Sequence, residues 1–267
     1  MSEAPFILLS NDDGVHSPAL LALRQALAAL GEVVVIAPER QWSAAGHGKT
    51  MHKPLRVATV TLADGSEARA SNGSPSDCVA LVMLGLLGRP PALVVSGINL
   101  GPNLGNDLIY SGTVSAAREG AIFGAPAIAA SLAGFETPHP DALRVGARFV
   151  ADLARQVLAH GLPQGMLLNV NIPNIAPADM RGVAVTRMGK SIYKDVLIER
   201  ADPRGRAYYW IGGDPPTGEP TPGTDFGAVA AGMVSVTPVQ LDMTDDTFLD
   251  RLRGWELSLH PEILTKG

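Results

Sequence analysis

Two adjacent carboxylates, Asp12 and Asp13, directly follow a short apolar run at residues 6–10. The apolar run predicts a buried strand, and residues 11–14 predict the turn at its end. Carboxylates held side by side repel each other unless a cation neutralises them, so the pair indicates a metal site. The alternative is a polar turn built only from good turn-forming residues.

Two further loops with oxygen-bearing side chains follow predicted strands. Residues 39–43 include Ser43, and residues 97–106 include Asn99 and Asn103. In open parallel sheets, ligands bind outside the carboxyl ends of the strands, so we expect these loops to line one site together with Asn11 and the acidic pair. The loops hold no cluster of imidazoles or thiolates, and oxygen donors suit Mg²⁺, Mn²⁺ or Ca²⁺.

Residues 110–115, Tyr-Ser-Gly-Thr-Val-Ser, lead into a helix predicted at 113–123. Backbone amides at a helix N-terminus bind phosphate, and the hydroxyls of Ser111 and Thr113 on either side of Gly112 would add donors. Ser-Gly-Thr is also a common helix-capping sequence, and the sequence does not choose between a cap and a phosphate cradle.

Three side chains near these motifs have more than one interpretation. His16 and His47 are candidate general acids, or loop histidines that are only solvated or hydrogen-bonded. Trp42 either stacks on the planar ring of a ligand or packs within its loop.

Apolar segments of strand length and helix length alternate along the first two thirds of the chain. Continuous apolar strands separated by helices predict a mostly parallel sheet that is covered on both faces, an α/β fold. We expect strands at residues 6–10, 33–37, 92–96, 127–131 and 166–171, and helices at residues 18–30, 74–86, 113–123 and 141–160.

Residues 174–224 differ from this pattern, because they are rich in Pro, Gly and charged residues. Short alternating stretches at 196–199 and 208–210 predict a β-hairpin arm that projects from the core. The apolar side chains of an isolated hairpin must be buried against another surface. We therefore expect the arm to form a protein interface, and the alternative is that it folds back onto its own core. A helical turn at 225–232 and a strand at 233–237 return the chain to the core. We therefore expect one domain over residues 1–267, with 174–224 as its arm.

The composition excludes several classes of protein. Of the 267 residues 46% are hydrophobic and 18% charged, a balance that can bury a core. The net charge of −5 disfavours binding to nucleic-acid polymers. The only cysteine is Cys78, which excludes an internal disulfide and fits a reducing compartment. No apolar run reaches the ~20 residues that span a bilayer. We expect a cytoplasmic protein without a membrane partner.

The ordered set of motifs resembles the SurE (survival protein E) family of 5′-nucleotidases from residue 6 to about residue 250. Each motif alone is only moderately specific, but their order and spacing together are highly specific. The matching segments are Ile-Leu-Leu-Ser-Asn-Asp-Asp-Gly at 7–14, Ala-Pro-Glu-Arg-Gln-Trp-Ser-Ala at 37–44, Asn-Gly-Ser-Pro-Ser-Asp-Cys-Val at 72–79, Ser-Gly-Ile-Asn-Leu-Gly-Pro-Asn at 96–103, Tyr-Ser-Gly-Thr-Val at 110–114, Thr-Asp-Phe at 224–226 and Ser-Val-Thr-Pro at 235–238.

The resemblance implies a Rossmann-like three-layer core and hydrolysis of nucleoside 5′-monophosphates, with some members also acting on 3′-nucleotides or short polyphosphate. It implies one divalent cation per subunit, Mg²⁺ or Mn²⁺, on Asp12, Asp13, Ser43 and Asn99. It also implies that the arm assembles a homodimer or homotetramer.

The chemistry within this class stays open at the level of sequence. Asp12 and Asp13 are the candidate catalytic residues, either as a base for direct attack by water or as the nucleophile of an aspartyl-phosphate step. Asn11, Asn103, Ser111, Gly112 and Thr113 are the candidates for binding phosphate. A non-enzymatic nucleotide sensor and a deacetylase on a similar core are the competing functions. Paired carboxylates disfavour the sensor, and the lack of a histidine in the matched ligand motifs disfavours the deacetylase.

Overall fold

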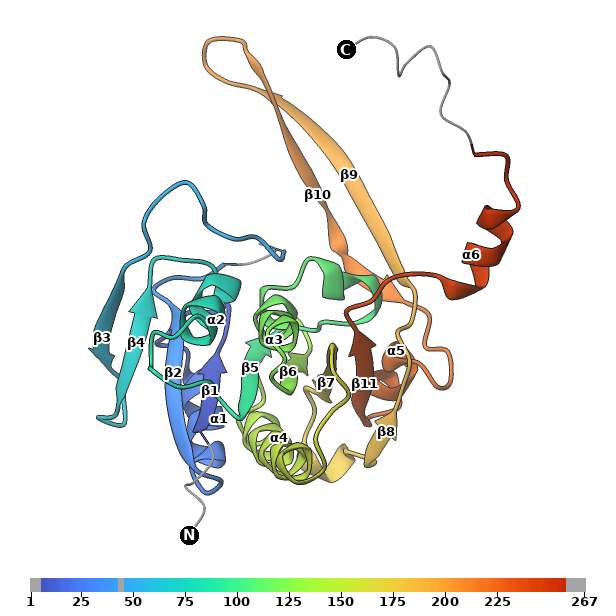
Figure 1. Cartoon of the computed structure of the whole chain (residues 1–267). Helices are drawn as coiled ribbons and strands as arrows, with labels where there is room; N and C mark the ends of the chain where they lie inside the picture. The colour runs from blue at the N-terminus through green and yellow to red at the C-terminus, as the bar shows by residue number, and fades with distance from the viewer. Residues whose placement is uncertain (1–5, 43–45, 258–267) are drawn as a thin grey trace, which may run out of the picture.

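Nine strands form one sheet in the part of the chain that the structure describes, residues 6–42 and 46–257 of this computed structural model (Figure 1). Their order is β3-β4-β2-β1-β5-β6-β7-β11-β8. The strands from β4 to β7 in this order are parallel, whereas β3 and β11 run antiparallel to β4 and β7. The strands are β1 Phe6–Ser10, β2 Glu32–Pro38, β3 Val57–Thr61, β4 Glu67–Ser71, β5 Leu93–Leu100, β6 Ala127–Ala133, β7 Met166–Pro173, β8 Val183–Val185 and β11 Val234–Gln240.

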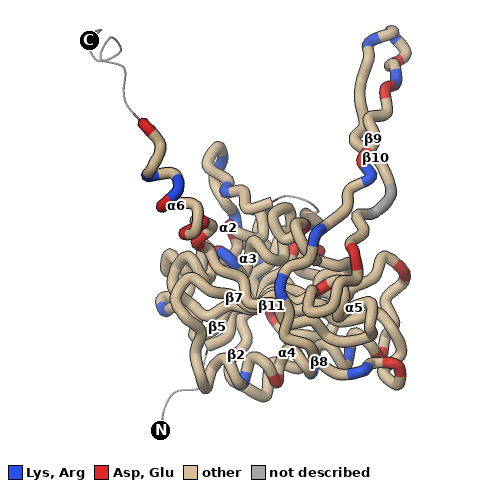
Figure 2. The backbone as a smooth tube through the Cα atoms, turned by 90° about the vertical axis from the view of Figure 1, so that its right-hand side faces the viewer, with Lys and Arg blue, Asp and Glu red and all other residues tan. Residues whose placement is uncertain are grey.

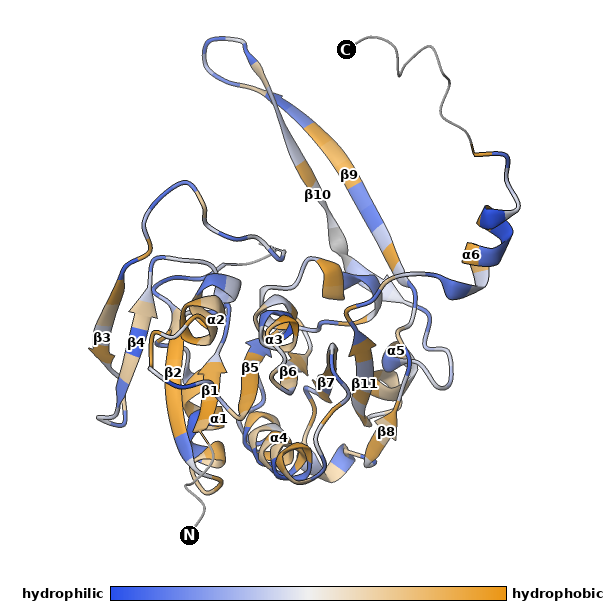
Figure 3. Cartoon of the chain, viewed as in Figure 1, coloured by the Kyte–Doolittle hydropathy of each residue, from blue (hydrophilic) through white to orange (hydrophobic). Residues whose placement is uncertain are grey.

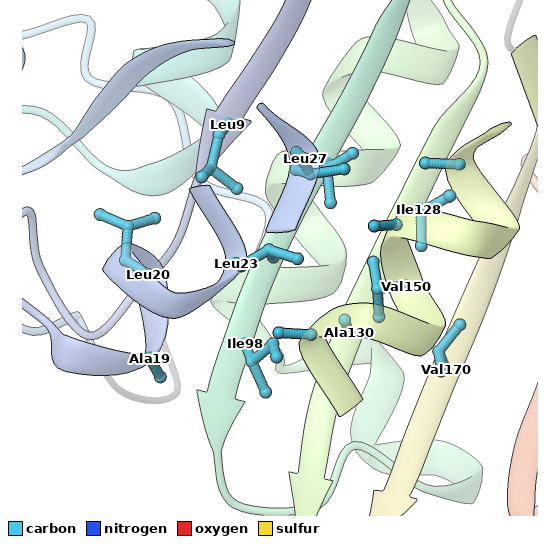
Figure 4. Close-up of a cluster of buried hydrophobic side chains, with 14 of the residues drawn as sticks. Leu9, Ala19, Leu20, Leu23, Leu27, Ile98, Ile128, Ala130, Val150 and Val170 are labelled. Carbon is cyan, nitrogen blue, oxygen red and sulfur yellow. The ribbon is translucent and has the colours of Figure 1, made fainter. Parts of the chain in front are cut away.

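Helices cover both faces of this sheet and complete three layers. α1 (Pro18–Leu27) packs with α4 (Pro140–His160), and α2 (Pro75–Met83) packs with α3 (Gly112–Ile122). Successive side chains of a strand point to opposite faces, so Ile7 and Leu9 join the cluster under α1 and α4, while Leu8 joins the cluster under α2 and α3. Figure 4 shows Leu9 in the first of these clusters, and Figure 3 shows the apolar central strands. The predicted three-layer α/β fold is confirmed.

The remaining helical segments are short. α5 (Asp225–Ala230) precedes β11, and α6 (Asp246–Arg253) lies near the end of the described chain. Two 3₁₀ turns, η1 (Gly105–Ile109) and η2 (Pro177–Asp179), follow β5 and β7. No helix among the described residues is long and apolar enough to cross a membrane.

Several element boundaries differ from the prediction. The first helix ends at Leu27 instead of continuing to residue 30, and β5 continues through residues 97–100, which we expected to be loop. The pairing of β5 with β6 shifts between Ser96 and Asn99, so the strand stays in the sheet while its last residues change register. The sequence analysis did not identify β3 and β4, because most of β3 is exposed and neither strand has an apolar run.

A two-stranded hairpin projects from the core, as Figures 1 and 2 show. It consists of β9 (Ser191–Ala201) and β10 (Ala207–Gly218), paired antiparallel. The projecting part is shorter than the predicted 174–224, because β8 within that range pairs with β11 in the core sheet. Tyr209 and Trp210 are exposed on the hairpin, which does not fold back onto its own core.

Candidate active site

Asp12 lies between the carboxyl end of β1 and the N-terminus of α3. Its side chain is only 7% exposed and accepts a hydrogen bond from the Thr113 hydroxyl. A Cβ atom at position 112 would lie 2.7 Å from the Asp12 Cβ and 2.8 Å from its Oδ2. Gly112 is therefore the residue that allows α3 to begin against this carboxylate.

Asp13 reaches the end of β5 because β1 and β5 are parallel neighbours, paired through Ser10 and Ser96. The backbone N–H of Leu100 donates to Asp13 Oδ2 at 3.2 Å. The Asn99 amide nitrogen donates to the Gly101 carbonyl at 2.8 Å, so its amide oxygen is the group that a cation would use. The predicted ligands of β1 and β5 are thus brought to the same edge of the sheet.

The acidic pair is poorly compensated by the protein. Burial, together with the smaller effect of the Asp13 carboxylate, raises the pKa of Asp12 to about 6 even though the Thr113 hydrogen bond lowers it. Burial also raises the pKa of Asp13. Among the described residues, no Lys or Arg forms an ion pair with either carboxylate. A bound cation would supply the missing charge.

The donor set suits a hard cation. The described residues contain no group of three His, Cys, Asp or Glu side chains that could hold a metal, so a histidine-rich zinc site is not formed there. Two carboxylates and an amide oxygen are ligands that Mg²⁺ and Mn²⁺ accept. Ser43, the fourth predicted ligand, lies outside the described residues. The preceding residue Trp42 donates its backbone N–H to the Asp12 carbonyl at 2.8 Å.

The N-terminus of α3 is capped by Ser111. Its hydroxyl accepts from the Val114 N–H at 3.1 Å, and its carbonyl accepts from the Ser115 hydroxyl at 2.6 Å. The capping interpretation of this sequence is therefore confirmed. The cap also places the first turn of α3, with its partial positive charge, against Asp12.

Asn11 and Asn103 organise the loops in the structure. Asn11 is fully buried, and its amide group makes bonds of 3.0 and 3.2 Å with the backbone of Gly14. The Asn103 amide nitrogen donates to the Ser131 hydroxyl at 2.7 Å, and its backbone N–H donates to Asn171 Oδ1 at 2.9 Å. Both side chains shape the turns around the acidic pair, and their predicted contact with phosphate stays a prediction.

A buried carboxylate that the sequence analysis missed, Glu119 on α3, holds the loop after β2. Its side chain is 0% exposed and lies 2.7 Å from His47 Nε2 and 2.6 Å from Lys49 Nζ. Burial would raise the pKa of Glu119, but these two partners hold it below its usual value. His47 is thus an anchor of this loop, whereas His16 is exposed. The sequence signal for this role was an acidic residue within a predicted helix. Its partners could not be predicted from local sequence, because His47 and Lys49 lie 72 and 70 residues away in the chain.

A second buried acid, Asp225, ties the base of the hairpin to the loop after β5. Its Oδ2 accepts from the Gly105 N–H and its Oδ1 accepts from the Gly189 N–H, both at 2.7 Å. Because Gly189 immediately precedes the hairpin, this one carboxylate connects the arm to the segment between Asn103 and α3.

The fold and the site together define a class: a Rossmann-like α/β protein with an uncompensated acidic pair at the carboxyl edge of its sheet, facing a helix N-terminus. The sequence model of the family "Survival protein SurE" matches residues 7–195. The 5′-nucleotidase SurE of Chloroflexus aggregans is 51% identical over 253 residues, which cover 94% of this chain and 99% of that protein. The 5′-nucleotidase SurE of Herpetosiphon aurantiacus is 54% identical over 246 residues, covering 92% and 96%.

A solved structure agrees with these relatives. The crystal structure of the SurE protein from Aquifex aeolicus superimposes with a TM-score of 0.79 at 41% identity, and the match covers 93% of this chain and 98% of that one. The chain therefore belongs to the SurE family.

Proposed function

We propose that this protein is a divalent-metal-dependent 5′-nucleotidase that hydrolyses nucleoside 5′-monophosphates to nucleoside and phosphate. The observation that carries the proposal is the acidic pair of buried Asp12 and half-buried Asp13, which no cationic side chain of the described residues neutralises. The names of the relatives, 5′-nucleotidase SurE, support the substrate class. Nucleoside 3′-monophosphates and short polyphosphate are proposed as further substrates.

One Mg²⁺ or Mn²⁺ per subunit would be held by Asp12, Asp13 and Asn99, with Ser43 as the fourth ligand. Such a cation neutralises phosphate charge and lowers the pKa of bound water. The hydrogen bond from Thr113 orients the Asp12 carboxylate, and the bond from Leu100 orients Asp13. Both carboxylates are therefore held in place before a ligand arrives, as a catalytic site requires.

The protein's own groups then act on the phosphate. The N-terminus of α3, with Ser111, Gly112 and Thr113, binds the phosphoryl oxygens and stabilises the charge that develops on them. In the simpler route, a water oxygen attacks phosphorus, Asp12 or Asp13 accepts the water proton, and the bond from phosphorus to the nucleoside 5′-oxygen breaks. The protonated aspartate then returns the proton to that oxygen, and the nucleoside leaves as its neutral alcohol. The alternative is attack by an aspartate followed by hydrolysis of the aspartyl phosphate.

A nucleotide sensor without turnover is the second candidate. A site that only binds phosphate gains nothing from two adjacent carboxylates, which disfavours this candidate. A deacetylase is disfavoured because such an enzyme would normally have a histidine among its metal ligands. Among the described residues, no histidine joins the acidic pair in a group that could hold a metal.

Phosphate release from a panel of 5′- and 3′-nucleotides and polyphosphate, with EDTA and then with added Mn²⁺ or Mg²⁺, separates these functions. We expect turnover that EDTA abolishes and metal restores. Asp12→Asn and Asp13→Asn should lose most activity, while Asp152→Asn on the exposed face of α4 serves as the matched control and should not. Near-normal turnover by either site variant in excess metal would show that the pair holds no catalytic cation.

Asn99→Ala tests the neutral ligand. It should raise the metal concentration that gives half-maximal activity without changing the unfolding midpoint in EDTA. An unchanged half-saturation point would make Asn99 a loop residue only.

The hairpin supports a further part of the proposal, a homodimer or homotetramer in the cytoplasm. Its exposed aromatic and aliphatic side chains form a surface that soluble monomers rarely expose, and a second copy of the chain would cover it.

A further inference from the structure

A cavity of about 280 Å³ opens at the ends of β5 and β6. Leu100 and Leu132 line it from the two strands, and Phe135, Pro138 and Asn174 line it from the neighbouring loops. Leu100 is the residue whose backbone N–H binds the Asp13 carboxylate. The cavity is therefore connected to the proposed metal ligand Asp13 through Leu100.

The loop between β6 and α4, residues 134–139, is held in place by Asn174. The Asn174 Oδ1 accepts from the His139 N–H at 2.7 Å, and its Nδ2 donates to the Thr137 carbonyl at 3.3 Å. A Cβ atom at position 134 would lie 2.9 Å from the Asn174 Cβ, so Gly134 permits this close packing. The wall of the cavity is thus built before a ligand arrives, which lowers the entropic cost of binding.

Phe135 is the aromatic residue of this wall, and its side chain is 63% exposed. Among the described residues, its ring has no aromatic or cationic partner. Trp42, another aromatic residue near the acidic pair, has the Arg40 guanidinium 5.7 Å from its ring centroid. Phe135 differs from Trp42 in that its ring lines the cavity without such a partner.

We propose that this cavity is the nucleobase subsite, in which the base of the substrate stacks on Phe135 while its phosphate lies at Asp12 and Asp13. The inference rests on the proposed nucleotidase function and adds to it a residue that sets the substrate class. Every base has a π-face, so stacking accepts purines and pyrimidines alike. The rest of the lining is mixed, with Leu100, Leu132 and Pro138 on the apolar side and Glu136, Thr137 and Asn174 on the polar side. Stacking on the Phe135 ring therefore distinguishes nucleotides from phosphate esters that lack a base.

Phe135→Ala, with Phe135→Tyr as the ring-retaining control, tests the subsite on the full-length protein. The substrates are AMP and CMP, compared with ribose 5-phosphate, which offers the same phosphate and sugar without a base. Base stacking on an aromatic residue is worth about tenfold in binding, so Phe135→Ala should lower kcat/KM for both nucleotides about tenfold. Its kcat/KM for ribose 5-phosphate should stay unchanged, and Phe135→Tyr should retain nucleotide turnover.

Two results would overturn the subsite. An equal loss of kcat/KM for ribose 5-phosphate would show that Phe135 only supports the loop. Unchanged kcat/KM for the nucleotides would place the base elsewhere, and Trp42→Ala then tests whether the base stacks on Trp42. Adenosine binding, measured by calorimetry, is independent of turnover. Wild-type protein that binds adenosine through Phe135 but releases no phosphate from AMP would refute the nucleotidase and keep the subsite. Turnover of AMP with adenosine binding that does not respond to Phe135→Ala would refute the subsite alone.

Discussion

Asp12→Asn should stabilise the metal-free protein while removing its activity. Burial raises the pKa of Asp12 from 3.8 to about 6 in the folded chain. The difference of roughly two pKa units corresponds to about 3 kcal/mol, since one unit is worth about 1.4 kcal/mol. Asparagine keeps an oxygen that accepts from Thr113 but carries no charge, so the variant avoids this cost.

The sign of the effect depends on pH. Below the unfolded-state pKa of 3.8, Asp12 is protonated in both states and the variant has no advantage. As pH rises from there to about 6, the unfolded chain releases its proton first, and the wild type loses stability relative to the variant. Above about 6 the full difference applies.

Urea unfolding followed by circular dichroism in EDTA measures this difference. We expect the variant to be more stable by up to about 3 kcal/mol at pH near 8, and equal to the wild type at pH near 3.5. Saturating Mn²⁺ should reverse the order, because a ligand at a thousand times its Kd adds about 4 kcal/mol to the wild type. A variant that is less stable than the wild type in EDTA at pH near 8 would refute the argument, because the protein would then already compensate the Asp12 charge.

Three other changes have defined outcomes. Gly112→Ala places a methyl group 2.8 Å from Asp12 Oδ2, so phosphate release should fall at least about tenfold with an unchanged circular dichroism spectrum; full activity would mean that the carboxylate needs no close approach to α3. Although burial would raise the pKa of Asp77, hydrogen bonds led by those from Thr50 lower it, so Asp77→Asn should cost about 1–2 kcal/mol at neutral pH. In urea titrations this loss of stability should shrink as pH falls below 3.8. A loss that does not depend on pH would contradict the claim that the hydrogen bonds stabilise the charged form of Asp77. Deleting residues 193–210 should reduce the oligomeric mass in light scattering, and a monomeric wild type or an unchanged mass would remove the hairpin from assembly.

Local patterns were enough to predict the elements that hold the acidic pair. The apolar run of β1 and the turn residues after it place Asp12 and Asp13 at a strand end, because strand and turn propensities act over a few neighbouring residues. The predicted cap at Ser111 is also local, since a capping hydroxyl binds an N–H three residues ahead. The edge strand β3 and its neighbour β4 lacked such a pattern.

The roles of individual polar side chains were not predictable in this way. Asn11, Asn99 and Asn103 carry the same amide group, yet Asn11 and Asn99 donate to the backbone of Gly14 and Gly101, whereas Asn103 donates to the Ser131 hydroxyl. The sequence predicts only that Glu119 is a charged residue within a helix. Its burial, and its contacts with His47 and Lys49, depend on how the loop after β2 crosses α3.

The sequence by itself determined the α/β class, the acidic pair at the end of the first strand and the family, because these follow from short-range periodicity and from ordered motifs. The tertiary structure decided which distant segments meet. It set Gly112 against Asp12, joined Asp225 to both Gly105 and Gly189, and placed Phe135 beside Leu100 at one cavity. Such contacts depend on the order and register of strands in the sheet, and no local propensity encodes that order.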